Sequence, residues 1–270
     1  METKRMTLLD LLDSERQTVV YPGVFRFSDE AVVRDVSADG KMGEIVYSSC
    51  TEAEIDRVIE RQVRAARSAG YELEWKVFGH DKPPCLGERL LAAGFEAGDK
   101  ELFMVLRADA DALVRFGAQQ GEIRRVTTEE GLKDYRTIRE EVSGKDCGSE
   151  IARYIPMLRD HPDSMSIYVA YVDREPAACG RVYFHPDSQL AGLYGGNTRE
   201  KFRRRGLFTQ IVAARIREAM RRGITSFCVD ALPTSEPILR KRGFQDVTYT
   251  QPFSLPQLAP PPPILFLTLP

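Results

Sequence analysis

The sequence lacks the long apolar runs and the charge imbalance that mark several classes of protein. Its 270 residues contain no run of apolar side chains long enough to span a bilayer, and the start Met1-Glu2-Thr3-Lys4-Arg5 shows no signal-peptide pattern. The formal net charge is −2, so the overall field does not attract nucleic acid or an anionic membrane. We therefore expect a cytoplasmic protein that binds neither nucleic acid nor membrane.

Metal-binding residue types are also scarce. The five cysteines are odd in number and widely spaced, with no Cys-x-x-Cys, which is typical of reduced structural thiols. The three histidines (His80, His161 and His185) show no ligand spacing with one another or with a cysteine. A Cys–His nucleophile pair has no support beyond composition. We therefore expect no metal site.

A basic turn is the most informative feature that is present. Residues 203–208 read Arg-Arg-Arg-Gly-Leu-Phe, between an apolar strand-like run and an amphipathic helix. The first N–H groups of a helix lack intrahelical partners, and the helix dipole and nearby guanidiniums favour an anion such as phosphate. On spacing alone, three arginines on a solvated face are the alternative interpretation. The context favours a phosphate-bearing ligand.

That context resembles the GNAT acyltransferase superfamily, whose pyrophosphate loop reads Q/R-x-x-G-x-G/A between a strand and a helix. Arg203 and Gly206 match the first two fixed positions of this loop. Residues 190–198 resemble the fourth strand of the family, residues 226–231 the fifth, and residues 235–244 the late helix with its closing Gly-Phe. Four motifs in the right order are more specific than any one of them.

The resemblance implies an activity. It is the direct transfer of an acetyl group from acetyl-CoA, as co-substrate, to a primary amine of a small molecule or peptide. In this family the fourth strand splays from the fifth, and its backbone N–H groups, here around 195–197, polarise the thioester oxygen. The residues implied to bind the co-substrate are Gly196, Asn197, Thr198, Arg203, Arg204, Arg205, Gly206, Leu207, Phe208, Thr209 and Ser235. The amine acceptor is the expected partner, and the sequence leaves open whether the protein forms a homodimer.

The acid and base of such a reaction have only candidates. Tyr194 lies on the strand that would face the thioester, and Asp230 lies near the end of the neighbouring strand. A core tyrosine and a solvated strand-end aspartate are the alternatives. Two positions depart from the family pattern: Phe208 stands in place of Gly or Ala, and Leu239 in place of a tyrosine that protonates the leaving thiolate. A non-catalytic acyl-CoA sensor or interaction module is therefore the alternative function.

An internal repeat sets the predicted fold. Residues 69–95 and 222–244 both run from a helix end through Gly, strand, Pro-containing turn and short helix to Gly-Phe and a closing strand. We predict an α/β (α+β) fold of two GNAT-like units in tandem, each a mixed, mostly antiparallel sheet flanked by helices. The predicted closing strand of the first unit is 102–106.

The two units are not equivalent. We expect a degenerate unit over 1–107, a linker over 108–121, an acyl-CoA-binding unit over 122–255, and a Pro-rich apolar tail over 256–270. Where the second unit has its basic Gly turn, the first has Ser48-Ser49-Cys50-Thr51-Glu52, whose acidic residue at a helix start would repel a pyrophosphate. A single CoA site per chain follows.

Overall fold

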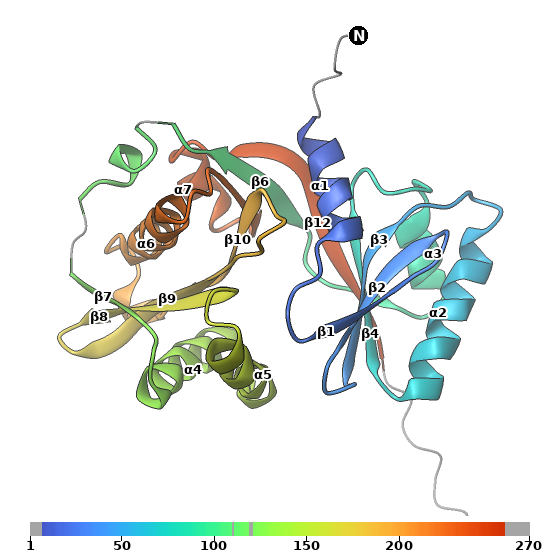
Figure 1. Ribbon diagram of the computed structural model, residues 1–270, viewed down its shortest axis with the longest axis horizontal. Coiled ribbons are helices and arrows are strands. Elements are labelled where there is room, and N and C mark those ends of the chain that lie inside the picture. The colour runs from blue at the N-terminus through green and yellow to red at the C-terminus, as the bar shows by residue number, and fades with distance from the viewer. Residues whose placement is uncertain (1–6, 110, 119–120, 257–270) are drawn as a thin grey trace, which may run out of the picture.

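The computed structural model describes residues 7–109, 111–118 and 121–256 (Figure 1). The elements of the first half are α1 (Leu8–Thr18), β1 (Val24–Ser28), β2 (Val32–Ser37), β3 (Met42–Ser48), α2 (Ile55–Ala69), β4 (Glu72–Phe78), α3 (Leu86–Ala92), β5 (Glu96–Ala97) and β6 (Glu101–Arg107). The elements of the second half are η1 (Val114–Phe116), β7 (Glu122–Arg125), α4 (Glu129–Ser143), α5 (Gly148–Asp160), β8 (Met165–Val172), β9 (Glu175–Tyr183), β10 (Leu190–Thr198), η2 (Glu200–Phe202), α6 (Leu207–Arg221), β11 (Ser226–Ala231), α7 (Glu236–Arg240) and β12 (Gln245–Leu255).

One continuous sheet of 12 strands runs through both halves, in the order β1-β2-β3-β4-β12-β6-β11-β10-β9-β8-β7, with β5 pairing with β12. In the described residues the parallel pairs are β3–β4 and β10–β11, and the other pairs between named strands are antiparallel. Each half therefore has a parallel pair joined through a helix, α2 or α6. This confirms the predicted fold class, a mostly antiparallel mixed sheet flanked by helices.

The closing strands of the two halves are exchanged. β12 pairs with β4 of the first half, whereas β6 pairs with β11 of the second half. Figure 1 shows β12 crossing from one half to the other. This corrects the predicted arrangement, in which each closing strand stays with its own unit. The central residues of β6 from Phe103 to Leu106 are buried, which suits the middle of a sheet covered on both faces. The boundaries at 108–121 stay a prediction.

Helices cover the sheet on both faces. In β8, Ile167 and Val169 pack in the core under α4 and α5, whereas Tyr168 and Ala170 pack with α6, as the two-residue period of a strand requires. Figure 1 accordingly shows α4 and α5 on the opposite side of these strands from α6 and α7. α2 and α3 pack on the sheet of the first half.

Helix α1 lies at the junction of the halves. Its Leu11 and Leu12 are buried with Phe78, Phe103, Val105, Leu190 and Cys228, from strands of both halves. The helix begins at a capping box between Thr7 and Asp10 and continues to Thr18, further than the run of apolar residues near its start indicates. The first helix thus binds the halves together.

Within the described residues, no helix has both the length and the apolar character needed to cross a membrane. Apart from Pro256, the predicted tail at 256–270 lies outside the described residues.

Candidate functional site

The central feature of the site is a gap between two parallel strands. β10 and β11 pair only over the first three residues of β10, from Leu190↔Ser226 to Gly192↔Cys228. β10 then continues to Thr198 and β11 to Ala231 without further pairing between them. Backbone groups beyond Gly192 therefore face a gap in which an extended ligand can take the place of a strand.

A bulge shapes β10 at this gap. Its register with β9 shifts between Tyr194 and Asn197, so Gly195 and Gly196 stand outside the ladder. Gly195 has φ 59°, and a Cβ there would lie 2.2 Å from Nη1 of Arg181, so only glycine fits. Nη1 of the buried Arg215 donates to the carbonyl of Tyr194 at 3.1 Å and fixes the start of the bulge.

A cavity of about 250 Å³ fills the gap. The predicted residues Tyr194, Gly196, Asn197, Phe208, Asp230 and Ser235 all line it, together with Leu239. Phe208 turns inward: a methyl group on Gly196 would lie 2.8 Å from its Cε2 atom. The aromatic ring therefore packs on β10 and leaves the first turn of α6 open, which resolves the departure noted at Phe208.

The predicted phosphate loop lies at the start of α6. Gly206 caps the helix in the left-handed conformation, at φ 74°, with no side-chain cap and no acidic residue in the first turn. Arg203, Arg204 and Arg205 are exposed around it. An uncapped helix N-terminus surrounded by guanidiniums has the geometry and the charge that favour an anion. Leu207 and Thr209 are buried on the other side of the turn and anchor it.

Three further predicted residues have partners that fix their positions. Oδ1 of Asn197 accepts from Nη1 of Arg139 at 2.7 Å, and Oγ of Ser235 donates to the carbonyl of Leu232 at 3.1 Å. The carbonyl of Thr198 accepts from Nε of Arg203 at 3.3 Å, which ties the loop to the strand. Oγ1 of Thr198 is buried without a hydrogen-bond partner in the described residues.

Tyr194 forms the wall between this cavity and a second one. It lines the cavity of 250 Å³ and also a cavity of about 410 Å³ between the two halves. Its ring lies 5.8 Å from that of Tyr183, and Nζ of Lys76 is 5.7 Å from its centre. Burial raises the pKa of Tyr194 well above its ordinary value, helped by the nearby Cys228 and Asp230. The phenol therefore keeps its proton at neutral pH.

Asp230 is engaged by two partners. Its carboxylate forms an ion pair with Nζ of Lys76 at 2.5 Å and accepts from Oγ1 of Thr250 at 2.8 Å. Although burial opposes the charge, the carboxylates of Asp230 and Glu44 hold the pKa of Lys76 above its ordinary value. Asp230 is thus close to the gap, as predicted, but it is charge-compensated rather than solvated.

Three arginines of the site were not predicted. Arg139 of α4, Arg181 of β9 and Arg215 of α6 line the cavity of 250 Å³. Burial lowers the pKa of Arg215 to about 10, so it stays cationic at neutral pH. The signal for two of them was present in the sequence, because Arg181 and Arg215 each interrupt an otherwise apolar strand or helix face.

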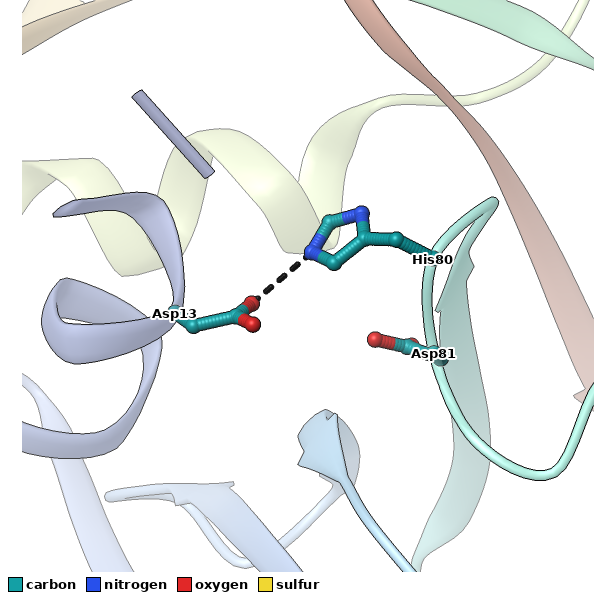
Figure 2. Close-up of side chains that lie close together, drawn as sticks. All are labelled: Asp13, His80 and Asp81. Atoms are coloured by element: carbon teal, nitrogen blue, oxygen red, sulfur yellow. Dashed lines mark hydrogen bonds and ion pairs between the residues drawn. The ribbon is translucent and has the colours of Figure 1, made fainter. Parts of the chain in front are cut away.

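A second polar cluster, of Asp13, His80 and Asp81, has ligand atoms within 4.8 Å of one another (Figure 2). Its centre is not free for a metal, because Arg16 donates to both oxygens of Asp81 and to Asp13, each at 2.8 Å. Nε2 of His80 lies 2.9 Å from Asp13. The guanidinium balances the carboxylates, so the cluster acts as an anchor of α1.

Comparisons with known proteins agree with this geometry. The model of the acetyltransferase (GNAT) family matches residues 129–244. No curated protein matches the chain significantly. A functionally unknown conserved protein from Staphylococcus epidermidis is 15% identical with a TM-score of 0.67, covering 88% of this chain and 95% of its own. A GCN5-related N-acetyltransferase from Kribbella flavida is also 15% identical, with a TM-score of 0.66. The match covers 87% of this chain and 90% of that protein.

A third structure matches the double arrangement. It is a tandem GNAT protein from the clavulanic acid biosynthesis pathway, 14% identical with a TM-score of 0.58, covering 87% of this chain and 84% of its own. At such identities the likeness shows the fold. The family match shows a GNAT acetyltransferase domain at residues 129–244 of this chain.

Proposed function

We propose that the protein is an acetyl-CoA-dependent N-acetyltransferase that transfers the acetyl group directly to a primary amine. The observation that carries the proposal is the gap between β10 and β11, which opens beside the uncapped, arginine-rich start of α6. A ligand that is both phosphate-bearing and extended suits these two features together. Acetyl-CoA has both properties.

Each part of the site has a role in this reaction. Arg203 to Thr209 would hold the pyrophosphate, and Gly196 and Thr198 would pair with the amides of the pantetheine arm. Backbone N–H groups at the bulge would stabilise the charge that develops on the thioester oxygen. The amine nitrogen forms a bond to the acyl carbon as the carbon–sulfur bond breaks. Tyr194 would protonate the thiolate that leaves, and the proton lost by the acylated nitrogen would return to the Tyr194 phenolate.

The structure of the first half is consistent with a single acetyl-CoA site per chain, which lies in the second half. Its own parallel pair, β3–β4, also separates beyond Ile45↔Trp75. There the carbonyl of Val46 accepts from Nε of Arg16 at 2.8 Å, and the buried indole of Trp75 donates to Oγ of Ser48 at 3.3 Å. Side chains of the protein itself thus occupy the position that a ligand would take.

The test is CoA release from acetyl-CoA in the presence of amino acids, polyamines and aminoglycosides. Turnover that depends on an added amine is the expected result. Acetyl-CoA binding without turnover on any amine would favour the sensor alternative, and the absence of binding would contradict both functions.

Replacement of Tyr194 by Phe is expected to slow acyl transfer by more than about tenfold, because it removes the proton donor for the thiolate. Affinity for CoA should change little, because only the hydroxyl group is lost. Pre-steady-state acyl transfer, combined with calorimetric titration of CoA, measures both quantities. Transfer at the parental rate in a folded variant would show that Tyr194 only packs and that solvent or substrate supplies the proton.

A further inference from the structure

The face of the first half that looks toward the second carries an unusual row of charges. Across neighbouring strands Arg26 pairs in register with Asp35, Asp35 with Glu44, and Glu44 with Glu74. Like charges directly opposite each other on neighbouring strands are destabilising. Three carboxylates in one row therefore need cations nearby. Within the row, Arg26 forms an ion pair with Asp35.

Glu44 is the carboxylate without a partner. Arg26 makes two hydrogen bonds of 2.7 Å to Asp35, Lys76 is paired with Asp230, and Arg181 lies 3.2 Å from Glu150. Among the described residues Glu44 has no hydrogen bond or ion pair of its side chain. Burial raises the pKa of Glu44 to about 7; the nearby Lys76 acts in the opposite direction, and Glu74 and Asp35 add to the effect of burial. A bound cation would relieve this cost.

Glu44 also lies where the empty spaces of the molecule meet. Three cavities, of about 780, 410 and 360 Å³, occupy the cleft between the halves. Among the residues that the structure describes, Glu44 is the one that lines all three. The cavity of 410 Å³ reaches Tyr194 and Arg181, which also line the gap between β10 and β11. Glu44 therefore lies in the cavity next to the gap, with Tyr194 between the two spaces.

The position of Glu44 outside the gap limits its role. Glu44 and Lys76 line the cavity of 410 Å³ but not the cavity in the gap, and Tyr194 stands between the two spaces. Glu44 is thus placed to hold a remote part of an acceptor whose reactive nitrogen lies at the gap. Because that nitrogen must be uncharged to attack, the group held at Glu44 is a second one.

We infer that the first half supplies the acceptor site, with Glu44 binding a second ammonium group of an acceptor that carries at least two amines. This inference rests on the proposed function, because it assigns the substrate class of the same site. Arg153 of α5 lines two of the cavities with Glu44, and Lys76 lines the third. These are competing cations on the protein, although neither forms an ion pair with Glu44 in the described structure.

Kinetics with spermidine and with n-butylamine, at saturating acetyl-CoA, test the inference. The parent should have a lower KM for spermidine than for butylamine. Glu44→Gln should raise the ratio of the spermidine KM to the butylamine KM about tenfold or more, because a hydrogen bond to a charged group is lost. Glu44→Asp, which keeps the charge, should recover part of the preference.

Glu74→Gln is the matched control, because Glu74 neighbours Glu44 on β4 but does not line the cavity that reaches Tyr194. It removes the same charge and should change the ratio much less. An equal effect of both variants, or no preference for spermidine in the parent, would overturn the inference. Equal melting temperatures and acetyl-CoA affinities of all variants exclude a folding defect as the cause.

A binding measurement separates this inference from the proposed function. Spermidine is titrated calorimetrically into the full chain saturated with CoA, which cannot react. Binding that is lost in Glu44→Gln supports the acceptor site even where no amine is acetylated. Turnover combined with an unchanged spermidine KM in Glu44→Gln would instead overturn the acceptor site and leave the proposed function intact. No spermidine binding to the parent would also overturn the acceptor site.

Discussion

Gly206→Glu should abolish the thermal stabilisation that saturating acetyl-CoA gives to the parent. The new carboxylate would lie at the uncapped N-terminus of α6, where it satisfies the N–H groups and repels the pyrophosphate. Loss of the dipole interaction and gain of repulsion are each worth about 1–2 kcal/mol, so affinity should fall between about thirtyfold and a thousandfold. Thermal shift measures the loss, and calorimetry on the parent should give one site per chain.

The control for this variant is Gly206→Gln, which has nearly the same shape without the charge. Both variants place a side chain at φ 74°, which costs about 1–2 kcal/mol, and no heavy atom lies within 4 Å of the added Cβ. Both should therefore fold with similar melting temperatures, whereas Gly206→Gln should keep more of the acetyl-CoA shift. An undiminished shift in folded Gly206→Glu would place the phosphate site elsewhere.

The loop and the strand of the site could be predicted from the sequence because their conformations depend on residues close together in the chain. A Gly before a helix, with basic neighbours and no acidic residue in the first turn, is visible in residues 203–209. The structure places this Gly at φ 74°. The glycines of 192–196 indicate close approach of backbone and ligand, and the structure places the bulge there. Such signals depend on residues near one another in the chain.

The exchange of closing strands could not be predicted in this way. Residues 102–106 and 245–255 both read as β-prone segments that follow a Gly-Phe, so either could pair with either half. The choice depends on burial across the whole sheet, since β6 is covered on both faces whereas β12 is largely half-exposed. Pairing partners far apart in sequence are set by tertiary packing.

Charged residues inside apolar strands and helices are a further sequence signal for the site. Lys76, Arg181 and Arg215 each lie in a strand or helix whose other central positions are mostly apolar. A buried charge is costly without a partner, so such a residue indicates a partner or a ligand. The partners, Asp230 and Glu150 or the carbonyl of Tyr194, lie far away in the chain or on another element and become visible only in the fold.

Asp81→Ala is expected to lower the free energy of unfolding by about 3 kcal/mol or more, the cost of breaking a buried ion pair. Arg16 and Asp81 are each less than a tenth exposed, and Asp81 also accepts from the backbone N–H of Phe78 at 2.9 Å. Without this carboxylate the Arg16 guanidinium keeps only Asp13 and the carbonyl of Val46 as hydrogen-bond partners. Urea unfolding followed by circular dichroism measures the loss.

A double variant distinguishes lost attraction from an uncompensated charge. Arg16→Leu with Asp81→Ala removes both charges, so it should be more stable than Asp81→Ala alone. A double variant as unstable as the sum of the two single variants would contradict this explanation. Stabilisation of the parent by Zn²⁺ would contradict it as well, because the metal would have to displace Arg16. Since Leu12, Glu15 and Arg16 of α1 line the cavity of 410 Å³, a weaker anchor should also raise the KM for the amine before it changes acetyl-CoA affinity.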